Sequence, residues 1–136
     1  MNAPLLDTHA WIWWVDQDPR LGARVLAALD ALPADRRPLV ADVSLWEVAM
    51  LVERGRLALD VPLREWLDAA AHPRSVRVVP VSPQIAAEVA SLPESFPRDP
   101  ADRLVVSTSR ALGVPLLTHD IRIAKSGLVR RWRLAA

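Results

Sequence analysis

"LLDTHAWIWW", residues 5–14, places an aspartate and a threonine directly after a short apolar run and ahead of three tryptophans. The run that ends at Leu6 is typical of a short buried strand, and the spacing from Thr8 onward predicts a helix. "VPLLTHD", residues 114–120, repeats the theme, because an apolar run is again followed by threonine and aspartate. Asp7 and Asp120 are therefore both predicted to stand at the ends of strands.

Working outward from these two stretches, short apolar runs alternate with helical patterns along the chain. Strands are expected at 4–7, 39–41, 76–81 and within 114–120, with a last short strand in 128–134. Helices are expected at 8–17, 20–32, 44–55, 62–71, 83–92 and 99–113. This alternation predicts an α/β domain with a mainly parallel sheet, in which active sites lie beyond the carboxyl ends of the strands.

The composition narrows the possible functions. A length of 136 residues suits one domain spanning 1–136, and the absence of cysteine excludes disulfides, thiolate metal sites and a cysteine nucleophile. The net charge of only +1 means that any contact with nucleic acid must come from a local patch. No signal peptide, membrane span or glycine-rich phosphate loop is visible, so we expect a cytoplasmic protein without membrane association or a nucleotide-binding loop.

Four acids are candidates for one shared site: Asp7, Glu47, Asp102 and Asp120. The topology predicts the first two and Asp120 at the carboxyl edge of the sheet, but the helix of Asp102 precedes a strand, so topology alone does not place Asp102 there. Two of the acids follow strands, and the other two lie in the first turns of predicted helices. Several carboxylates at one point repel each other unless a cation is present. Oxygen ligands without histidine or cysteine suit Mg²⁺ or Mn²⁺, and such a site can activate water for in-line attack on a phosphodiester.

The same acids also have purely structural explanations. "SLWE", residues 44–47, matches a capping box in which Ser44 caps a helix and Glu47 reaches back to it. "DPAD", residues 99–102, places a capping aspartate before a proline at the first helical position. The two strand-end aspartates could likewise cap the segments that follow them. Residue by residue both explanations stay open, but the combination favours a shared site.

"LLDTHAWIWW", "SLWEVAMLVERGRLAL", "FPRDPADRLVVSTSRALGVPLLTHD" and "IAKSGLVRRW" occur in an order and spacing that resembles a known family. Over essentially the whole chain they look like PIN-domain proteins, specifically the VapC-type toxins of bacterial type II toxin–antitoxin systems. The resemblance implies a PIN-like three-layer fold, with a mainly parallel five-stranded sheet flanked by helices.

By the same resemblance, the activity is that of an endoribonuclease that depends on Mg²⁺, or alternatively Mn²⁺, and hydrolyses RNA phosphodiester bonds. The implied catalytic and metal-binding residues are Asp7, Glu47, Asp102 and Asp120. The implied partners are an RNA substrate, a cognate VapB-like antitoxin whose C-terminal segment enters the acidic groove, and a second copy of the chain in a homodimer. The alternative function is a non-catalytic PIN-like module that acts through protein binding and regulation.

Several neighbouring residues are candidate accessories. Asp99 either supports the metal site or only caps its helix, and Thr8 and Thr118 could hold a carboxylate or a water or serve as strand and cap residues. Arg122, Lys125 and Arg103 could contact RNA phosphates, with surface solvation as the alternative.

Histidines and tryptophans also lie close to the proposed acids. His9 and His119 adjoin them, and peripheral roles are favoured because metal-assisted hydrolysis needs no histidine base. The tryptophans at 11, 13, 14 and 46 could stack RNA bases, but core packing or a protein interface is favoured.

Overall fold

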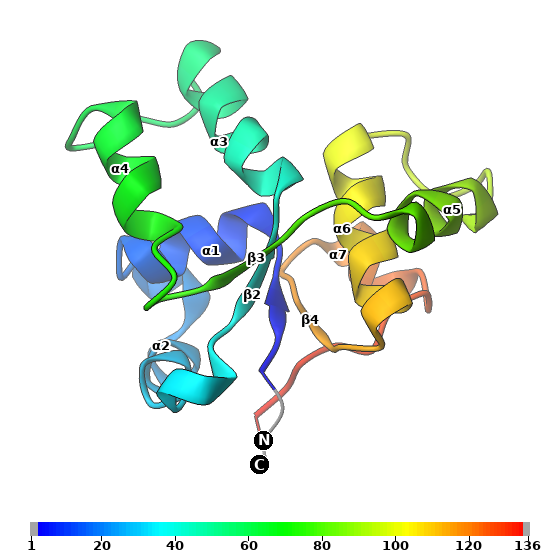
Figure 1. Ribbon diagram of the computed structural model, residues 1–136, viewed down its shortest axis with the longest axis horizontal. Coiled ribbons are helices and arrows are strands. Elements are labelled where there is room, and N and C mark those ends of the chain that lie inside the picture. The colour runs from blue at the N-terminus through cyan, green and yellow to red at the C-terminus, as the bar shows by residue number, and fades with distance from the viewer. Residues whose placement is uncertain (1–2, 135–136) are drawn as a thin grey trace.

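The computed structural model describes residues 3–134, which fold around a small parallel sheet (Figure 1). Its strands stand in the order β3-β2-β1-β4, and every neighbouring pair is parallel. They are β1 (Leu5–Leu6), β2 (Leu39–Ala41), β3 (Arg77–Val79) and β4 (Leu116–Leu117). The predicted α/β class and the parallel sheet are confirmed.

The sheet has four strands rather than the expected five. Within the stretch 128–134, Arg131 forms only an isolated parallel bridge with Leu116. The amide of Leu116 donates to the carbonyl of Arg130 at 2.8 Å, and that of Trp132 donates to the carbonyl of Leu116 at 2.9 Å. The pairing does not extend into a fifth strand, because β4 is only two residues long and has few backbone groups with which a neighbouring strand could pair.

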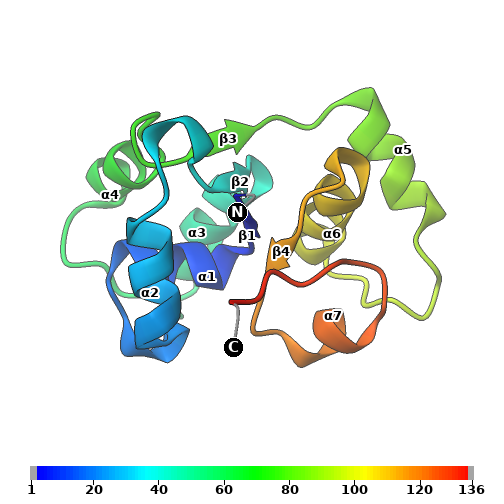
Figure 2. The same cartoon turned by 90° about the horizontal axis from the view of Figure 1, so that it is seen from below.

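Helices cover both faces of the sheet. They are α1 (Thr8–Val15), α2 (Ala23–Asp30), α3 (Val43–Glu53), α4 (Leu63–Ala70), α5 (Pro83–Ser91), α6 (Pro100–Leu112) and α7 (Ile121–Lys125). Two 3₁₀ turns, η1 (Pro19–Leu21) and η2 (Ala34–Arg36), lie between them. Figure 2 shows the sheet separating α1, α2 and α4 from α5, α6 and α7, which gives the predicted three layers.

The helix expected over 20–32 is wrong at its beginning. Asp18 caps the 3₁₀ turn η1, and Gly22 then breaks the helical path with a φ of 100° before α2 begins at Ala23. Glycine adopts this left-handed region without the steric cost that other residues incur. The helix α7 was not expected from the sequence, and it begins because Asp120 caps it.

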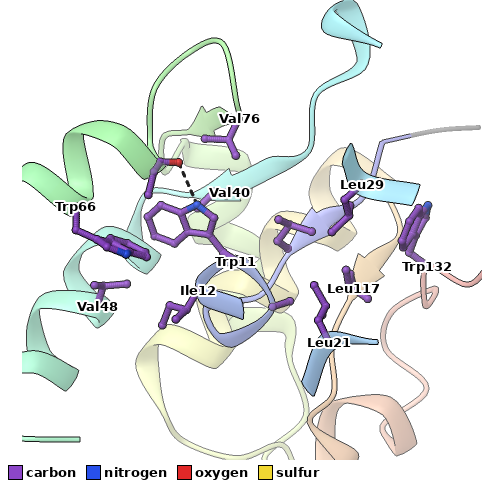
Figure 3. Close-up of a cluster of buried hydrophobic side chains, with 13 residues drawn as sticks. Trp11, Ile12, Leu21, Leu29, Val40, Val48, Trp66, Val76, Leu117 and Trp132 are labelled. Carbon is purple, nitrogen blue, oxygen red and sulfur yellow. Dashed lines mark hydrogen bonds between the residues drawn. The ribbon is translucent and has the colours of Figure 1, made fainter. Parts of the chain in front are cut away.

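Alternation along the strands sorts their side chains between two cores. Leu6, Val40 and Leu117 face the layer of α1, α2 and α4, where Trp11 and Trp66 are buried (Figure 3). The opposite face carries Leu5, Leu39, Ala41 and Leu116, which pack with side chains of α5, α6 and α7. Successive residues of a strand point to opposite faces, so even two-residue strands contribute to both cores.

The order of the strands locates the place where a site can form. From β1 the chain moves outward to β2 and β3, and it then returns across the sheet to β4 on the other side of β1. Ligands of open α/β sheets bind beyond the carboxyl ends of the strands at such a switch point. Here that point lies between the ends of β1 and β4, which are followed by Asp7 and the 118–120 segment.

Among residues 3–134, no helix combines the length and the apolar character that a membrane crossing requires.

Candidate metal-binding active site

The structure brings the four predicted acids to a single cavity of about 220 Å³. Asp7 follows β1 and Asp120 follows β4, so both come from the switch point of the sheet. Glu47 projects from α3 and Asp102 from the first turn of α6, which approaches from the other side (Figure 1). Segments separated by more than a hundred residues in the sequence thus share one acidic pocket.

The capping alternative for Asp7 is confirmed, and the metal-binding alternative stays a prediction. Asp7 is the N-cap of α1, and its Oδ1 accepts a hydrogen bond from the amide of Ala10 at 2.8 Å. It also lines the acidic cavity, where the side chain of Thr118 forms a hydrogen bond with it. Burial raises the pKa of Asp7, although these hydrogen bonds oppose the shift.

The capping-box explanation for Glu47 is wrong. The helix α3 begins at Val43 with Asp42 as its N-cap, so Ser44 is already inside the helix. The Ser44 hydroxyl is buried and lies 2.8 Å from the Oγ1 of Thr8, which donates a hydrogen bond to the Oε1 of Glu47. Thr8 therefore orients Glu47, in agreement with the prediction that its hydroxyl could hold a carboxylate. The contact of Thr8 with Ser44 was not predicted.

Asp99 lies closer to the acids than its accessory status suggested. It caps α6 by accepting a hydrogen bond from the amide of Asp102 at 3.0 Å. Carboxylate oxygens of Glu47, Asp99 and Asp102 also lie within 4.8 Å of one another, a spacing that one cation could bridge. The capping alternative for Asp99 is therefore confirmed, while its support of a metal site stays a prediction that the proximity to Glu47 and Asp102 favours.

Asp120 is anchored by its own helix and by Arg122. Its Oδ1 accepts hydrogen bonds from the amides of Arg122 and Ile123, at 2.8 and 3.4 Å. The Arg122 guanidinium lies 3.2 Å from Asp120 and 3.5 Å from Asp102. Burial tends to raise the pKa of Asp120, but the hydrogen bonds from Arg122 outweigh it and hold that pKa below its usual value.

Among the acids of this cluster, Asp102 has a strongly raised pKa. Burial, followed by the negative charges of Asp99, Glu47 and Asp120, raises the pKa of Asp102 to about 7. Burial likewise raises the pKa of Glu47, against the hydrogen bond from Thr8. The nearby Arg122 guanidinium does not balance the negative charge around Asp102, and a divalent cation would add positive charge there. The donors of this cluster are all carboxylate oxygens, and they fit Mg²⁺ or Mn²⁺.

Without a cation, the protein is expected to lose stability as the pH rises from about 4 to about 7. The pKa of Asp102 lies at about 7 in the folded protein against an ordinary value of 3.8, so over this range the folded state keeps a proton that the unfolded state has released. In a chelating buffer, the melting temperature should therefore be lower at pH 8 than at pH 5, by about a few degrees.

Asp102→Asn should remove most of this pH dependence, whereas the exposed Asp68→Asn on α4 should retain it. Adding Mg²⁺ at pH 8 should restore stability to the wild type, because the cation replaces the proton. A wild-type protein that melts higher at pH 8 than at pH 5 in chelator would contradict this picture of the cluster.

The three predicted basic contacts lie in different surroundings. Arg122 lies at the rim of the acids, and Lys125 lines a separate cavity that Arg122 also borders. Arg103 donates to the carbonyls of Phe96 and Pro97, at 2.9 and 3.0 Å, and its guanidinium stacks over the ring of Phe96. These contacts favour a structural role for Arg103 in holding the segment before α6.

A group of three aromatic rings that line the cavity at an angle to one another was not predicted from the sequence. The ring of Trp13 lies 6.0 Å from that of His9 and 5.5 Å from that of His119, and Arg20 covers it at 5.1 Å. Trp13, His9 and His119 line the pocket with the four acids. The i, i+4 spacing of His9 and Trp13 could have indicated that these two rings are neighbours on one helix. The third ring, that of His119, comes from a segment remote in the sequence.

A parallel α/β fold with an acidic pocket at the switch point of its sheet defines a class of protein, and comparison with known sequences identifies the family. The sequence model of the PIN domain matches residues 5–127, and the chain belongs to this family. Ribonuclease VapC22 of Mycobacterium tuberculosis (strain ATCC 25618 / H37Rv) is 39% identical over 123 residues, which cover 90% of this chain and 91% of that protein. The predicted resemblance is confirmed.

Solved structures agree on the fold. A chain in the crystal structure of VapBC2 from Rickettsia felis, bound to a DNA fragment from their promoter, has a TM-score of 0.72 at 14% identity, over 96% of this chain and 97% of its own length. A chain of a toxin–antitoxin complex from Klebsiella pneumoniae has a TM-score of 0.65 at 17% identity, over 93% and 95% of the two chains. At these identities the likeness concerns the fold alone.

Proposed function

We propose that this protein is a divalent-metal-dependent endoribonuclease and the toxin of a toxin–antitoxin pair. The observation that carries the proposal is the convergence of Asp7, Glu47, Asp102 and Asp120 in one pocket at the switch point of the sheet. The raised pKa values within this cluster and the ribonuclease name of the 39% identical relative give it further support.

In this proposal the four acids, joined by Asp99, hold Mg²⁺ or Mn²⁺. When bound, the cation supplies Lewis-acid activation of water and neutralises charge on the scissile phosphate. The protein itself orients the acids. Thr8 holds Glu47 by a hydrogen bond, and the Thr118 side chain forms a hydrogen bond with Asp7. The Thr118 hydroxyl also accepts a hydrogen bond from the backbone amide of Asp120 at 3.0 Å, so it connects Asp7 to the segment of Asp120. Ligands held in this way do not have to be ordered when the cation arrives.

Arg122 has a separate role in the proposal. Its guanidinium, 62% exposed, is the cation that the structure places against Asp102 and Asp120. A divalent ion bound to those carboxylates would compete with these exposed ion pairs, which are weak. Arg122 would then be free to bind a phosphate of the substrate at the edge of the acidic site, as a planar guanidinium does well.

Removal of the metal tests the activity directly. Purified protein incubated with a labelled RNA pool should cleave it in Mg²⁺ or Mn²⁺, and excess chelator should reduce cleavage to background. Readdition of either cation should restore the rate. Cleavage that continues unchanged in chelator would contradict the metal site, whereas no cleavage under any condition would favour the non-catalytic regulatory alternative.

The proposal extends to the partners. It includes a VapB-like antitoxin that covers the acidic pocket, and a homodimer of the toxin. Expression of the chain alone should slow growth, and coexpression of a neighbouring antitoxin gene should relieve it. Sedimentation of the purified chain, alone and mixed with that antitoxin, should give the masses of a dimer and of a complex. A monomer would remove the homodimer from the proposal without affecting the nuclease.

A further inference from the structure

A second cavity, of about 520 Å³, adjoins the acidic pocket on the side of α3. The two cavities share His9, Glu47, Asp102 and Asp120, so they form one continuous hollow. Its far wall is different in character, because it carries the indole of Trp46 and the guanidinium groups of Arg54 and Arg56. An acidic floor therefore continues into a wall that is aromatic and basic.

Trp46 is unusual among the tryptophans of this chain. It is 52% exposed, whereas Trp11, Trp66 and Trp132 are buried. It stands directly before Glu47 in α3, so the indole and the candidate metal ligand lie in adjacent positions of one helix. Within residues 3–134, no other aromatic ring stacks on it. A large ring that is exposed beside a polar site offers a face to a partner.

Arg54 and Arg56 place positive charge at the other end of the same wall. Arg54 is the C-cap of α3, and Gly55, with a φ of 70°, turns the chain so that Arg56 follows. In the described part of the chain, neither guanidinium has an ion-pair or side-chain hydrogen-bond partner, and both are exposed. Arginines without partners that flank an acidic metal site can bind the phosphates adjacent to the one that is cleaved.

We infer that a base of single-stranded RNA stacks on Trp46 next to the scissile phosphate, while Arg54 and Arg56 bind the phosphates that lead away from it. The inference rests on the proposed nuclease function and assigns its substrate wall. Aromatic rings combined with a cationic track are the common means of holding single strands. Bases within a duplex are already stacked on their neighbours, so the wall selects unpaired segments.

Charge favours RNA over a protein as the occupant of this wall. The hollow alternates a carboxylate floor with an arginine rim, which matches a phosphodiester chain that crosses a cation and continues along guanidinium groups. A helix docked by its apolar face would need a continuous apolar stripe, but Arg54 and Arg56 interrupt the wall beyond Met50 and Leu51.

Trp46→Ala tests the stacking. In the wild-type background, KM for a single-stranded oligoribonucleotide should rise roughly tenfold or more, with kcat changed by less than about twofold. In the Asp7→Asn background, the Kd for the same RNA in Mg²⁺ should rise by a similar factor. Trp46→Phe should retain most of the affinity, because it keeps an aromatic face.

The paired variant Arg54→Gln with Arg56→Gln tests the phosphate contacts. It should weaken binding of the same RNA and reduce the salt dependence of log Kd by about 1.4, the expectation for two lost contacts with a single strand. Arg64→Gln with Arg74→Gln removes the same charge from exposed positions outside the hollow and is the matched control. It should leave Kd and its salt dependence unchanged.

Unchanged KM and Kd in Trp46→Ala would overturn the inference, and so would a loss of antitoxin binding with RNA binding intact, which would assign the wall to a protein. If the wild type cleaves no RNA, the proposed nuclease function fails, and the binding comparison in the Asp7→Asn background still decides the role of Trp46. Thermal melts of each variant establish that the fold is retained, as expected for exposed side chains.

Discussion

Asp7→Asn is expected to lower metal-dependent RNA cleavage by about a hundredfold or more without loss of the fold. A carboxylate ligand contributes to a metal centre whose transition-state stabilisation is worth several kcal/mol, and each 1.4 kcal/mol is about tenfold in rate. Asparagine caps helices as well as aspartate, so the hydrogen bond from Ala10 to residue 7 can be kept.

The variant also separates a catalytic role from a structural one. Burial raises the pKa of Asp7, so its ionised form is disfavoured in the folded protein when no cation is present. A neutral asparagine should therefore melt at the same temperature as the wild type in chelator, or higher. Upon addition of Mg²⁺ the wild type should gain stability and the variant should gain less, because it has lost a ligand.

Asp35→Asn is the matched control for this experiment. Asp35 is exposed and lines a different cavity, next to the start of β2 at the opposite end of the sheet. Its replacement should leave the cleavage rate and the response to Mg²⁺ unchanged. Equal cleavage by wild type and Asp7→Asn would exclude Asp7 from the metal site and leave it only as the cap of α1.

Trp11→Ala is expected to destabilise the protein by about 3–5 kcal/mol, the range for removal of a buried aromatic side chain. Trp11 has no exposed surface, and its Nε1 donates to the carbonyl of Ala70 at 3.1 Å (Figure 3). Its ring also packs edge-on against Trp66 at 5.2 Å. Since domains are stable by only about 5–15 kcal/mol, much of the variant should be unfolded under mild denaturant.

Urea denaturation followed by circular dichroism measures this loss. Trp11→Phe keeps most of the packing but leaves the Ala70 carbonyl without its donor, and it should cost about 1–3 kcal/mol. Trp46→Ala removes the same side chain from the exposed site on α3 and should change the free energy of unfolding by about 0.5 kcal/mol or less. Similar losses for positions 11 and 46 would show that burial does not distinguish them.

Most of the secondary structure was open to prediction because it is decided locally. The apolar runs before Asp7 and Asp120 form β1 and β4, and the pattern after Asp99 forms α6 and ends at Gly113, whose φ is 65°. Capping, helix-breaking glycines and apolar periodicity act within a few residues, so the sequence displays them. The wrong beginning of the helix predicted at 20–32 shows where apolar periodicity fails as a guide. The apolar spacing continues past Gly22, but the backbone breaks the helix at that glycine.

The site was only partly open to prediction. The four candidate acids were identified from the strand-end positions of Asp7 and Asp120, from the helix-start positions of Glu47 and Asp102, and from the resemblance of motifs. The surroundings of these acids could not be predicted from the sequence. The spacing of Ser44 and Glu47 suggested a capping box, whereas both side chains contact Thr8, which is remote in the sequence. The large pKa shift of Asp102 likewise arises from charges on segments remote in the sequence, Glu47 and Asp120 among them.

The sequence by itself thus determined most of the elements, their order and the identity of the candidate acids, because each depends on residue type and neighbours along the chain. Only the tertiary structure decided what the tryptophans of the opening stretch do, since burial depends on what packs against each face of α1. Trp11 is enclosed by α4 and the sheet, whereas Trp13 packs at an angle against the rings of His9 and His119 at the pocket. The fold likewise decided that Asp99 joins Glu47 and Asp102, because the sheet brings α3 and α6 together above the ends of its strands.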